Sequence, residues 1–327
     1  MAIGLGGGGA LAISLETVPG TYQDPSTAGT VWVPILSEGL KYTEDKYYSP
    51  QLRQETIVSD VKQSYYHAEG DVVMEVDTQF LPYFLHASRH DVTKTGSGPY
   101  QYKYVPNQSA TSDQTASITV IRNEIGFGYG GCVMGSFEFM IENGVLRVTM
   151  NVLGQSEEEP ADLDTASWVA PKLLGADAHS VYVAASAVTP TFSGNDVNHN
   201  GFTFMANYNA TAQNRIVPDR AATYIAFGET EASYNTELDF VSRTEYNNFV
   251  AATQRAVKLE SIGDAVSFAT SADAVRLQAN RSAYDTYDLG LEGIGDIVMA
   301  RGVTGRIIGI AGGDPFEIIV KSTANIT

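Results

Sequence analysis

The sequence predicts a mainly β protein, and three observations lead to that prediction. Gly (31), Tyr (18) and Phe (13) are plentiful among the 327 residues, and charged residues make up only 18%. That composition is typical of sheet proteins rather than helical ones. Short segments of alternating apolar and polar residues recur along the chain. The second half also resembles the first, so we predict a β-rich unit that is duplicated in tandem.

The charge balance and the single cysteine exclude several classes of protein. The chain has 38 acidic and 20 basic residues, which gives a net charge of −18. Tight binding of a phosphate backbone needs clustered Lys and Arg side chains. The acidic balance therefore disfavours a protein that binds nucleic acid tightly. Cys132 has no partner for a disulfide or a Cys-based metal site, and we expect it to be a small buried hydrophobe. No apolar run reaches the roughly 18 residues of a membrane span.

The chain divides into four segments. Residues 1–36 begin with a Gly-rich stretch that cannot form a core, so we predict an N-terminal arm that is disordered or ordered by a neighbouring subunit. Residues 37–154 form the first predicted repeat and 191–327 the second. Residues 155–190 between them are predicted to be a linker, because Gln155–Pro160 breaks the strand pattern.

The clearest local signal is a β-hairpin over residues 135–153. Two alternating segments flank Asn143-Gly144, the pair that a type I′ turn prefers. Phe137, Phe139 and Ile141 fall on one face of the first strand, and Glu138 and Glu142 fall on the other. The hairpin therefore has one apolar face for a core and one polar face.

Two helices are predicted, one in each repeat. Residues 78–88 carry apolar side chains at helical spacing, with Thr78 as the N-cap and Pro82 near the first turn. Residues 242–256 form the second helix, with Ser242 and Glu245 as a capping box. The polar stretch 93–116 is predicted to be a loop.

Three matches support the internal repeat. Glu75-Val-Asp77 matches Glu237-Leu-Asp239 as a strand that ends beside a helix, and Leu146–Thr149 is paired with Phe316–Ile319. The apolar positions of the two helices also correspond: Leu81 with Tyr246, Phe84 with Phe249, and Leu85 with Val250. The offset between matches grows along the chain, as loop changes after an old duplication would cause.

Three motifs suggest chemistry, and each has a simpler interpretation. Gly126–Gly131 has the spacing of a dinucleotide fingerprint, but a strand rather than a helix is predicted to follow, so a Gly-rich bend is favoured. Asp196–Gly201 opens like a calcium loop, but Asn207 occupies the position where a bidentate Glu is needed. His86 and His90 lack a third metal ligand and are expected to interact with the helix C-terminus.

No other catalytic signature is visible. The sequence has no Gly-x-Ser-x-Gly elbow, His-Glu-x-x-His motif or phosphate-binding loop. We therefore predict a protein that is not an enzyme and that needs no cofactor or metal.

Four stretches resemble one family: Glu16–Thr21, Gly131–Gly154, Ala256–Asp264 and Gly290–Asp296. They are similar to the long-form tail tube (major tail) proteins of siphophages, and the similarity covers nearly the whole chain. The resemblance implies a tube domain that is a β-sandwich or barrel with a flanking helix, here duplicated in tandem. It also implies subunits that close into rings around a continuous inner β-barrel. It implies rings that stack through an N-terminal arm and an extended loop. With two tube domains per chain, three subunits would make a pseudo-six-fold ring; a ring of six single-domain subunits is the alternative.

The resemblance also implies partners and a location. The channel would hold the tape measure protein and later conduct double-stranded DNA without binding it. Further rings of the same protein, the tail terminator and distal tail proteins would be the other partners. The protein would be assembled in the host cytoplasm, act in the virion tail and contact no membrane.

An acidic channel wall would repel DNA over a screening length of about 8 Å. The candidates for that wall are Glu75, Asp77, Glu138, Glu142, Glu237 and Asp239, although solvated strand faces commonly carry such residues. Two other functions stay open. One is a different virion structural protein, either a receptor-binding tail fibre or a capsid decoration protein. The other is a secreted carbohydrate-active enzyme with a pair of carboxylates.

Overall fold

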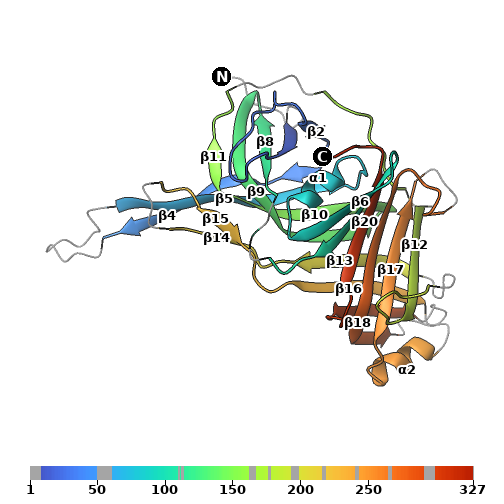
Figure 1. Cartoon of the computed structure of the whole chain (residues 1–327). Helices are drawn as coiled ribbons and strands as arrows, with labels where there is room; N and C mark the ends of the chain where they lie inside the picture. The colour runs from blue at the N-terminus through green and yellow to red at the C-terminus, as the bar shows by residue number, and fades with distance from the viewer. Residues whose placement is uncertain are drawn as a thin grey trace.

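The computed structural model describes residues 9–49, 61–109, 111, 114–161, 167–175, 178–192, 199–215, 219–239, 243–263, 267–290 and 299–326. These residues form twenty strands and two short helices, so the prediction of a mainly β protein is confirmed (Figure 1). The helices are α1 (Leu81–His86) and α2 (Thr244–Val250). All pairings between the named strands are antiparallel.

The first half of the chain contains eleven strands. They are β1 (Ala10–Leu15), β2 (Val31–Val33), β3 (Ser37–Glu38), β4 (Lys41–Tyr48), β5 (Val61–Glu75), β6 (His90–Thr95), β7 (Tyr100–Pro106), β8 (Ala116–Arg122), β9 (Ile125–Glu142), β10 (Val145–Gly154) and β11 (Ser156–Glu158). Those of the second half are β12 (His179–Ala185), β13 (His199–Asn207), β14 (Thr211–Gln213), β15 (Tyr224–Ala226), β16 (Glu231–Asp239), β17 (Arg255–Ile262), β18 (Ala274–Gly290), β19 (Met299–Ile307) and β20 (Phe316–Ser322).

One sheet, called the long sheet below, runs through both halves of the chain. Its strands lie in the order β4-β5-β10-β9-β13-β16-β19-β18, and β3 extends β4 along the edge of β5. The first half contributes the strands up to β9 and the second half those from β13. The two halves are joined by the pairing of β9 with β13, from Ser136↔Asn207 to Met140↔Thr203.

Two outer sheets pack against the long sheet. The first is β2-β1-β8-β9-β11 and the second is β12-β17-β18-β20-β7-β6. The long strands β9 and β18 belong to two sheets each: the start of each strand pairs in an outer sheet and its end pairs in the long sheet. In Figure 1 the strands of the second outer sheet cross those of the long sheet steeply.

The same set of pairings occurs twice along the chain. In the first half the pairs are β1–β8, β3–β5 continued by the first residue of β4, β5–β10, β9–β10, β8–β9 and β9–β11. In the second half they are β12–β17, β13–β16, β16–β19, β18–β19, β17–β18 and β18–β20. A helix follows β5 in one half and β16 in the other. The hairpin β6–β7 has no counterpart among the described residues of the second half.

This correspondence agrees with two of the predicted matches and corrects the third. Glu75 and Glu237 lie near the ends of the equivalent strands β5 and β16, and α1 is equivalent to α2. Leu146 lies in β10, which is equivalent to β19, whereas Phe316 lies in β20, which is equivalent to β11. The third match was wrong because alternating strands resemble one another, and only their partners distinguish them.

The core lies between the long sheet and the outer sheets. Phe137 and Phe139 from β9 and Phe204 from β13 are buried on the inner face of the long sheet, and Phe316 from β20 meets Phe204 with ring centroids 5.7 Å apart. The apolar side chains of α1 are fully buried, but α2 has no buried residue. The two helices are therefore equivalent in topology and different in environment.

The predicted loop at residues 93–116 contains most of a hairpin, so that prediction was wrong. β6 pairs with β7, and β7 pairs with β20 from the far end of the chain. Such a long-range pairing leaves no local signal in a polar sequence. Both helices are also shorter than predicted. Thr78 does not cap α1 but donates its hydroxyl to Asp273, and Ser242 lies outside the described residues.

The N-terminal segment is ordered by its own chain over the described residues, which corrects the prediction of an arm that is disordered or ordered by a neighbouring subunit. β1 pairs with β8 along its whole length, and Leu11 and Ile13 are fully buried. Residues 1–8 lie outside the described residues. The predicted linker 155–190 likewise contributes β11 and β12 to the outer sheets.

Candidate functional site

The long sheet has one face packed on the core and one polar face turned away from it. Register places Glu75, Arg147, Met140, Thr203 and Asn235 in one row across β5, β10, β9, β13 and β16. These side chains alternate with the buried ones along each strand. The polar face is thus a single surface that both halves of the chain build.

Four of the six predicted acidic residues lie on this polar face. Glu75, Glu138, Glu142 and Glu237 come from β5, β9 and β16, and all four are half-buried in the single chain. Their strands present the opposite side, including Met74, to the core. For Glu138 and Glu142 the alternation in the sequence predicted the face of the strand on which they lie.

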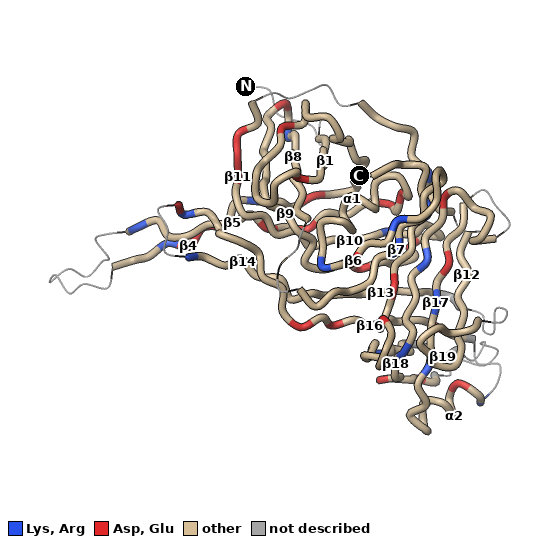
Figure 2. The backbone as a smooth tube through the Cα atoms, viewed as in Figure 1, with Lys and Arg blue, Asp and Glu red and all other residues tan. Residues whose placement is uncertain are grey.

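Further charges on the same face were missed by the sequence analysis. Register adds Glu69, Asp71 and Glu231 as acidic residues, and Lys41, Arg147 and Arg306 as basic ones. Acidic side chains therefore outnumber basic ones on this face. Figure 2 marks the positions of the acidic and basic residues along the backbone. Their strand alternation could have revealed them, but only the pairing register shows that they share a surface.

Arg147 partly neutralises this surface. Its guanidinium forms an ion pair with Glu142 across the β9–β10 hairpin, and Glu75 is its register partner on β5. Exposed ion pairs of this kind contribute little to stability. Their consequence is electrostatic: among the ion pairs of the described residues none involves Glu138 or Glu237, so no basic partner offsets these two acidic side chains on the face.

Asp77, the fifth predicted acid, is buried with an exposed fraction of 3%, so its assignment to a channel surface was wrong. Its carboxylate accepts hydrogen bonds from the backbone N–H groups of Gln79 (2.8 Å) and Lys172 (2.7 Å). Burial raises the pKa of Asp77 above its ordinary value, and the two N–H donors oppose that shift. Asp77 turns inward because the chain leaves β5 at this point to begin α1.

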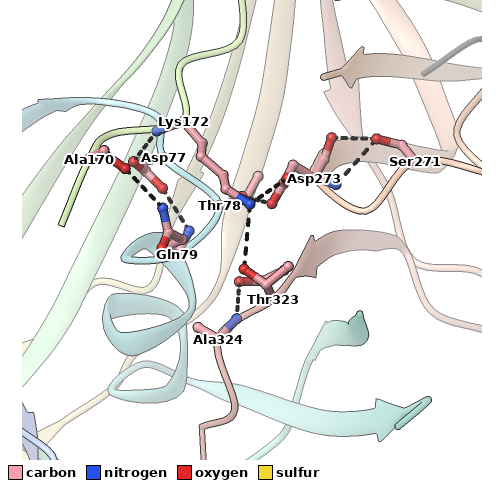
Figure 3. A network of polar contacts seen from close by, with 10 residues as sticks. Asp77, Thr78, Gln79, Ala170, Lys172, Ser271, Asp273, Thr323 and Ala324 are labelled. Atoms are coloured by element: carbon pink, nitrogen blue, oxygen red, sulfur yellow. Dashed lines mark hydrogen bonds and ion pairs between the residues drawn. The ribbon is translucent and has the colours of Figure 1, made fainter. Parts of the chain in front are cut away.

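Asp77 belongs to a polar network that joins the two halves of the chain (Figure 3). Asp273, in the turn before β18, accepts a hydrogen bond of 3.0 Å from Thr78 and lies 2.8 Å from the ammonium of Lys172. Lys172 also reaches the hydroxyl of Thr323 near the C-terminus. The start of α1 is therefore fixed to the segment before β12 and to the second repeat.

Asp239, the sixth predicted acid, is the last residue of β16 and pairs with Met299 through its backbone. Its side chain lies outside the described part of the structure. The assignment of Asp239 to the polar face stays a prediction.

The histidines of the first repeat have structural contacts. His90 is buried between the hydroxyls of Ser88 (2.5 Å) and Tyr208 (2.7 Å), and desolvation lowers its pKa from 6.5 to about 3. His86 contacts the carbonyl of Pro82 through Nδ1, in the last turn of α1. Across the described ranges no group of three or more His, Cys, Asp or Glu could hold a metal ion.

The Gly-rich motif lies within β9. A Cβ atom on Gly128 would lie 2.5 Å from Cζ of Tyr22, whose ring covers this part of the strand. The glycine spacing thus serves close packing of the N-terminal segment. The calcium-like motif Asp196–Gly201 begins in residues outside the described ones.

A second candidate surface is the hairpin of β4 and β5, which projects from the body of the molecule (Figure 1). Tyr47, Tyr48 and Val61 near its far end are exposed by more than half. Large apolar side chains gathered on a projecting hairpin suggest an interaction surface. No helix among the described residues has the length and hydropathy to cross a membrane.

Comparison with models of known protein families gives a match over most of the chain. A family model described as phage tail tube protein matches residues 6–302 of the chain. No match is found among curated proteins. The matched region spans both helices and most of the long sheet.

Proposed function

Because the chain belongs to the phage tail tube protein family, we propose that its copies close into rings that stack into the tube of a siphophage tail. The family is structural, so membership supports a location in the virion tail, self-assembly into tube rings and a non-enzymatic role. In the proposed tube the long sheet forms part of an inner barrel and its polar face lines the channel.

One observation carries the proposal: a continuous sheet from both halves presents one polar, predominantly acidic face and open margins. Within the described residues, β3 and β4 pair only with β5 at one margin, and the end of β18 pairs only with β19 at the other. Open margins favour pairing with further strands, and ring closure removes them. A sheet closed in this way puts the polar face on the inside of a ring.

The charge of that face suits a conduit for DNA. Contacts between basic side chains and DNA phosphates, summed over many rings, would bind the duplex too tightly for it to move. Acidic side chains repel the phosphates instead. We propose that the channel first holds the tape measure protein and then conducts double-stranded DNA during ejection. The terminator and distal tail proteins would bind the two ends of the tube, and assembly would take place in the host cytoplasm.

The repeated strand pairings support a tandem duplication of one tube domain. We propose boundaries close to the predicted ones, with 37–154 and 191–327 as the two repeats and 155–190 as the connection. The outer-sheet strands β1 and β12 would then precede each repeat as equivalent elements. Two repeats per chain favour three subunits per ring, with the projecting β4–β5 hairpin contacting the next ring.

Negative-stain electron microscopy of the purified protein tests the proposal. We expect stacked rings or tubes with an open axial channel. Counting subunits in top views separates a ring of three from a ring of six. Persistent monomers at high concentration would contradict the proposed function.

A further inference from the structure

The pairing of β9 with β13 inside one chain shows how the end of one repeat accepts the start of the next. The free end of β18 is equivalent to the end of β9, and the segment 36–41 is equivalent to β13. We propose that the junction between two copies of this chain repeats the internal junction, with β18 of one copy pairing antiparallel with residues 36–41 of the next. This inference rests on the proposed ring and specifies its contacts.

The equivalent positions follow from shared partners. Ser136 and Ala283 occupy the same place, opposite Asn151 of β10 and Arg306 of β19 respectively. Asn207 and Lys41 are also equivalent positions, because Asn207 lies opposite Glu231 of β16 and Lys41 lies opposite Glu69 of β5. The internal pair Ser136↔Asn207 therefore predicts Ala283 opposite Lys41 of the next copy.

A second pair fixes the other end of this register. Ile141 is opposite Leu146 and Leu289 is opposite Ala300, which makes Ile141 and Leu289 equivalent. Leu36 precedes Ser37, the partner of Val73, as Phe202 precedes Thr203, the partner of Asn235. One residue beyond Met140↔Thr203, the internal junction brings Ile141 beside Phe202. The predicted junction brings Leu289 beside Leu36, with one bulged residue of β18, Asp285, in between.

Burial supports this assignment. At the internal junction Phe202 is only 3% exposed, and Ile141 packs against the core. At the two free margins Leu36 is 49% exposed and Leu289 is 37% exposed, although both follow the core-facing alternation of their strands. Pairing the margins would cover both leucines, as their equivalents are covered within the chain.

The helix α2 provides an independent argument. Thr78, in the segment that leads into α1, donates a hydrogen bond to Asp273 in the turn before β18, so the approach to the first helix touches the second repeat. By the same relation α2 would lie against the turn before β9 in the next copy. A cavity of about 420 Å³ is found there, lined by Ile35, Leu36, Ile121 and Asn123 among others. Val250 of α2 is 65% exposed and is suited to cover the apolar side chains of this mixed lining, Ile35, Leu36 and Ile121.

Disulfide trapping in the full-length chain tests the register. The variant Ala283→Cys/Lys41→Cys is expected to give covalent oligomers under mild oxidation, ending at the number of subunits in the ring. Ser136→Cys/Asn207→Cys is the matched internal control and should form its bond within one chain. Ala283→Cys/Ser37→Cys is out of register and should give at least tenfold less product. Native Cys132 is fully buried and does not compete.

The outcomes separate this inference from the proposed function. Tubes in the microscope without in-register oligomers, or with equal product from the out-of-register pair, would overturn the junction and leave the tube function standing. Failure to form tubes or oligomers would overturn both. In a second experiment Val250→Asp should leave the melting temperature of the monomer unchanged and lower the assembled fraction at least tenfold. Asn247→Asp, exposed on the same helix, should assemble normally, and equal assembly by both variants would contradict the role of α2.

Discussion

The carboxylate of Glu16 accepts a hydrogen bond of 2.8 Å from the backbone N–H of Gly131, and so ties the N-terminal segment to the middle of β9. It also accepts bonds from Gly20, Thr115 and Ser117 at 2.5–2.8 Å. The residue is 3% exposed, so its charge is held by these donors rather than by water.

Replacing Glu16 with Ala should lower the free energy of unfolding by about 3 kcal/mol, because several buried donors lose their acceptor. Urea denaturation of the disassembled subunit measures this change. Glu159→Ala, at an exposed site next to β11, is the matched control and should stay within about 0.5 kcal/mol of the wild type. Equal stability of the two variants would show that the Glu16 contacts are not needed.

Deletion of residues 1–30 should prevent stable folding of the subunit. The deletion removes β1 with Leu11 and Ile13, and it leaves the edge of β8 unpaired. Circular dichroism and gel filtration check this expectation. A soluble, cooperatively folding product would contradict it and would restore the interpretation of this segment as an arm that a neighbouring subunit orders.

His90 should make the subunit sensitive to acid. Its pKa is about 3 in the folded protein and 6.5 as the ordinary value, so folding favours the neutral ring. Its contribution is complete above pH 6.5 and is lost as the pH falls towards 3, by up to about 1.4 kcal/mol per pH unit. His90→Gln should therefore show a flatter decline of stability between pH 6 and 4. Parallel curves for the variant and the wild type would rule out this role.

The contact between Thr78 and Asp273 should couple the two halves of the chain. A double-mutant cycle with Thr78→Val and Asp273→Ala should give a coupling energy of about 1 kcal/mol, since the two side chains share a hydrogen bond. Thermal or urea unfolding of the wild type, the two single variants and the double variant measures this coupling energy. Additive effects would mean that this hydrogen bond does not link the repeats energetically.

A side chain added at Gly128 should destabilise the subunit as long as Tyr22 is present. Gly128→Ala is expected to cost about 2 kcal/mol, because its Cβ would overlap the tyrosine ring. The cost should fall in a Tyr22→Ala background. Gly309→Ala is the control, since no atom lies within 4 Å of an added Cβ there. Equal costs in the two backgrounds would locate the strain elsewhere.

Charge reversal on the polar face should change how the tube handles DNA. Tubes of Glu138→Lys/Glu237→Lys are expected to bind duplex DNA with a steep salt dependence, while wild-type tubes do not. Glu158→Lys/Glu159→Lys, at exposed positions off the long sheet, controls for the same change in net charge. In virions carrying the variant, ejection should slow. Unchanged binding and ejection would argue against this face as the channel wall.

The alternating sequence determined much about this protein. It predicted the β class, the hairpin with Asn143 and Gly144 both at positive φ, and the orientation of Glu138 and Glu142, because a period of two and a turn type are local properties. The order of the strands was not local. The pairing of β7 with β20 and the equivalence of β10 with β19 depend on partners far along the chain.

Burial was likewise decided only by the tertiary structure. Asp77 and Glu138 both follow the pattern of acids on strands, yet the first is enclosed where β5 turns into α1 and the second stays on the open face. The alternation of polar and apolar residues predicts only on which side of its own strand a residue lies. What covers that side depends on packing between segments that are distant in sequence, and so it emerged only with the fold.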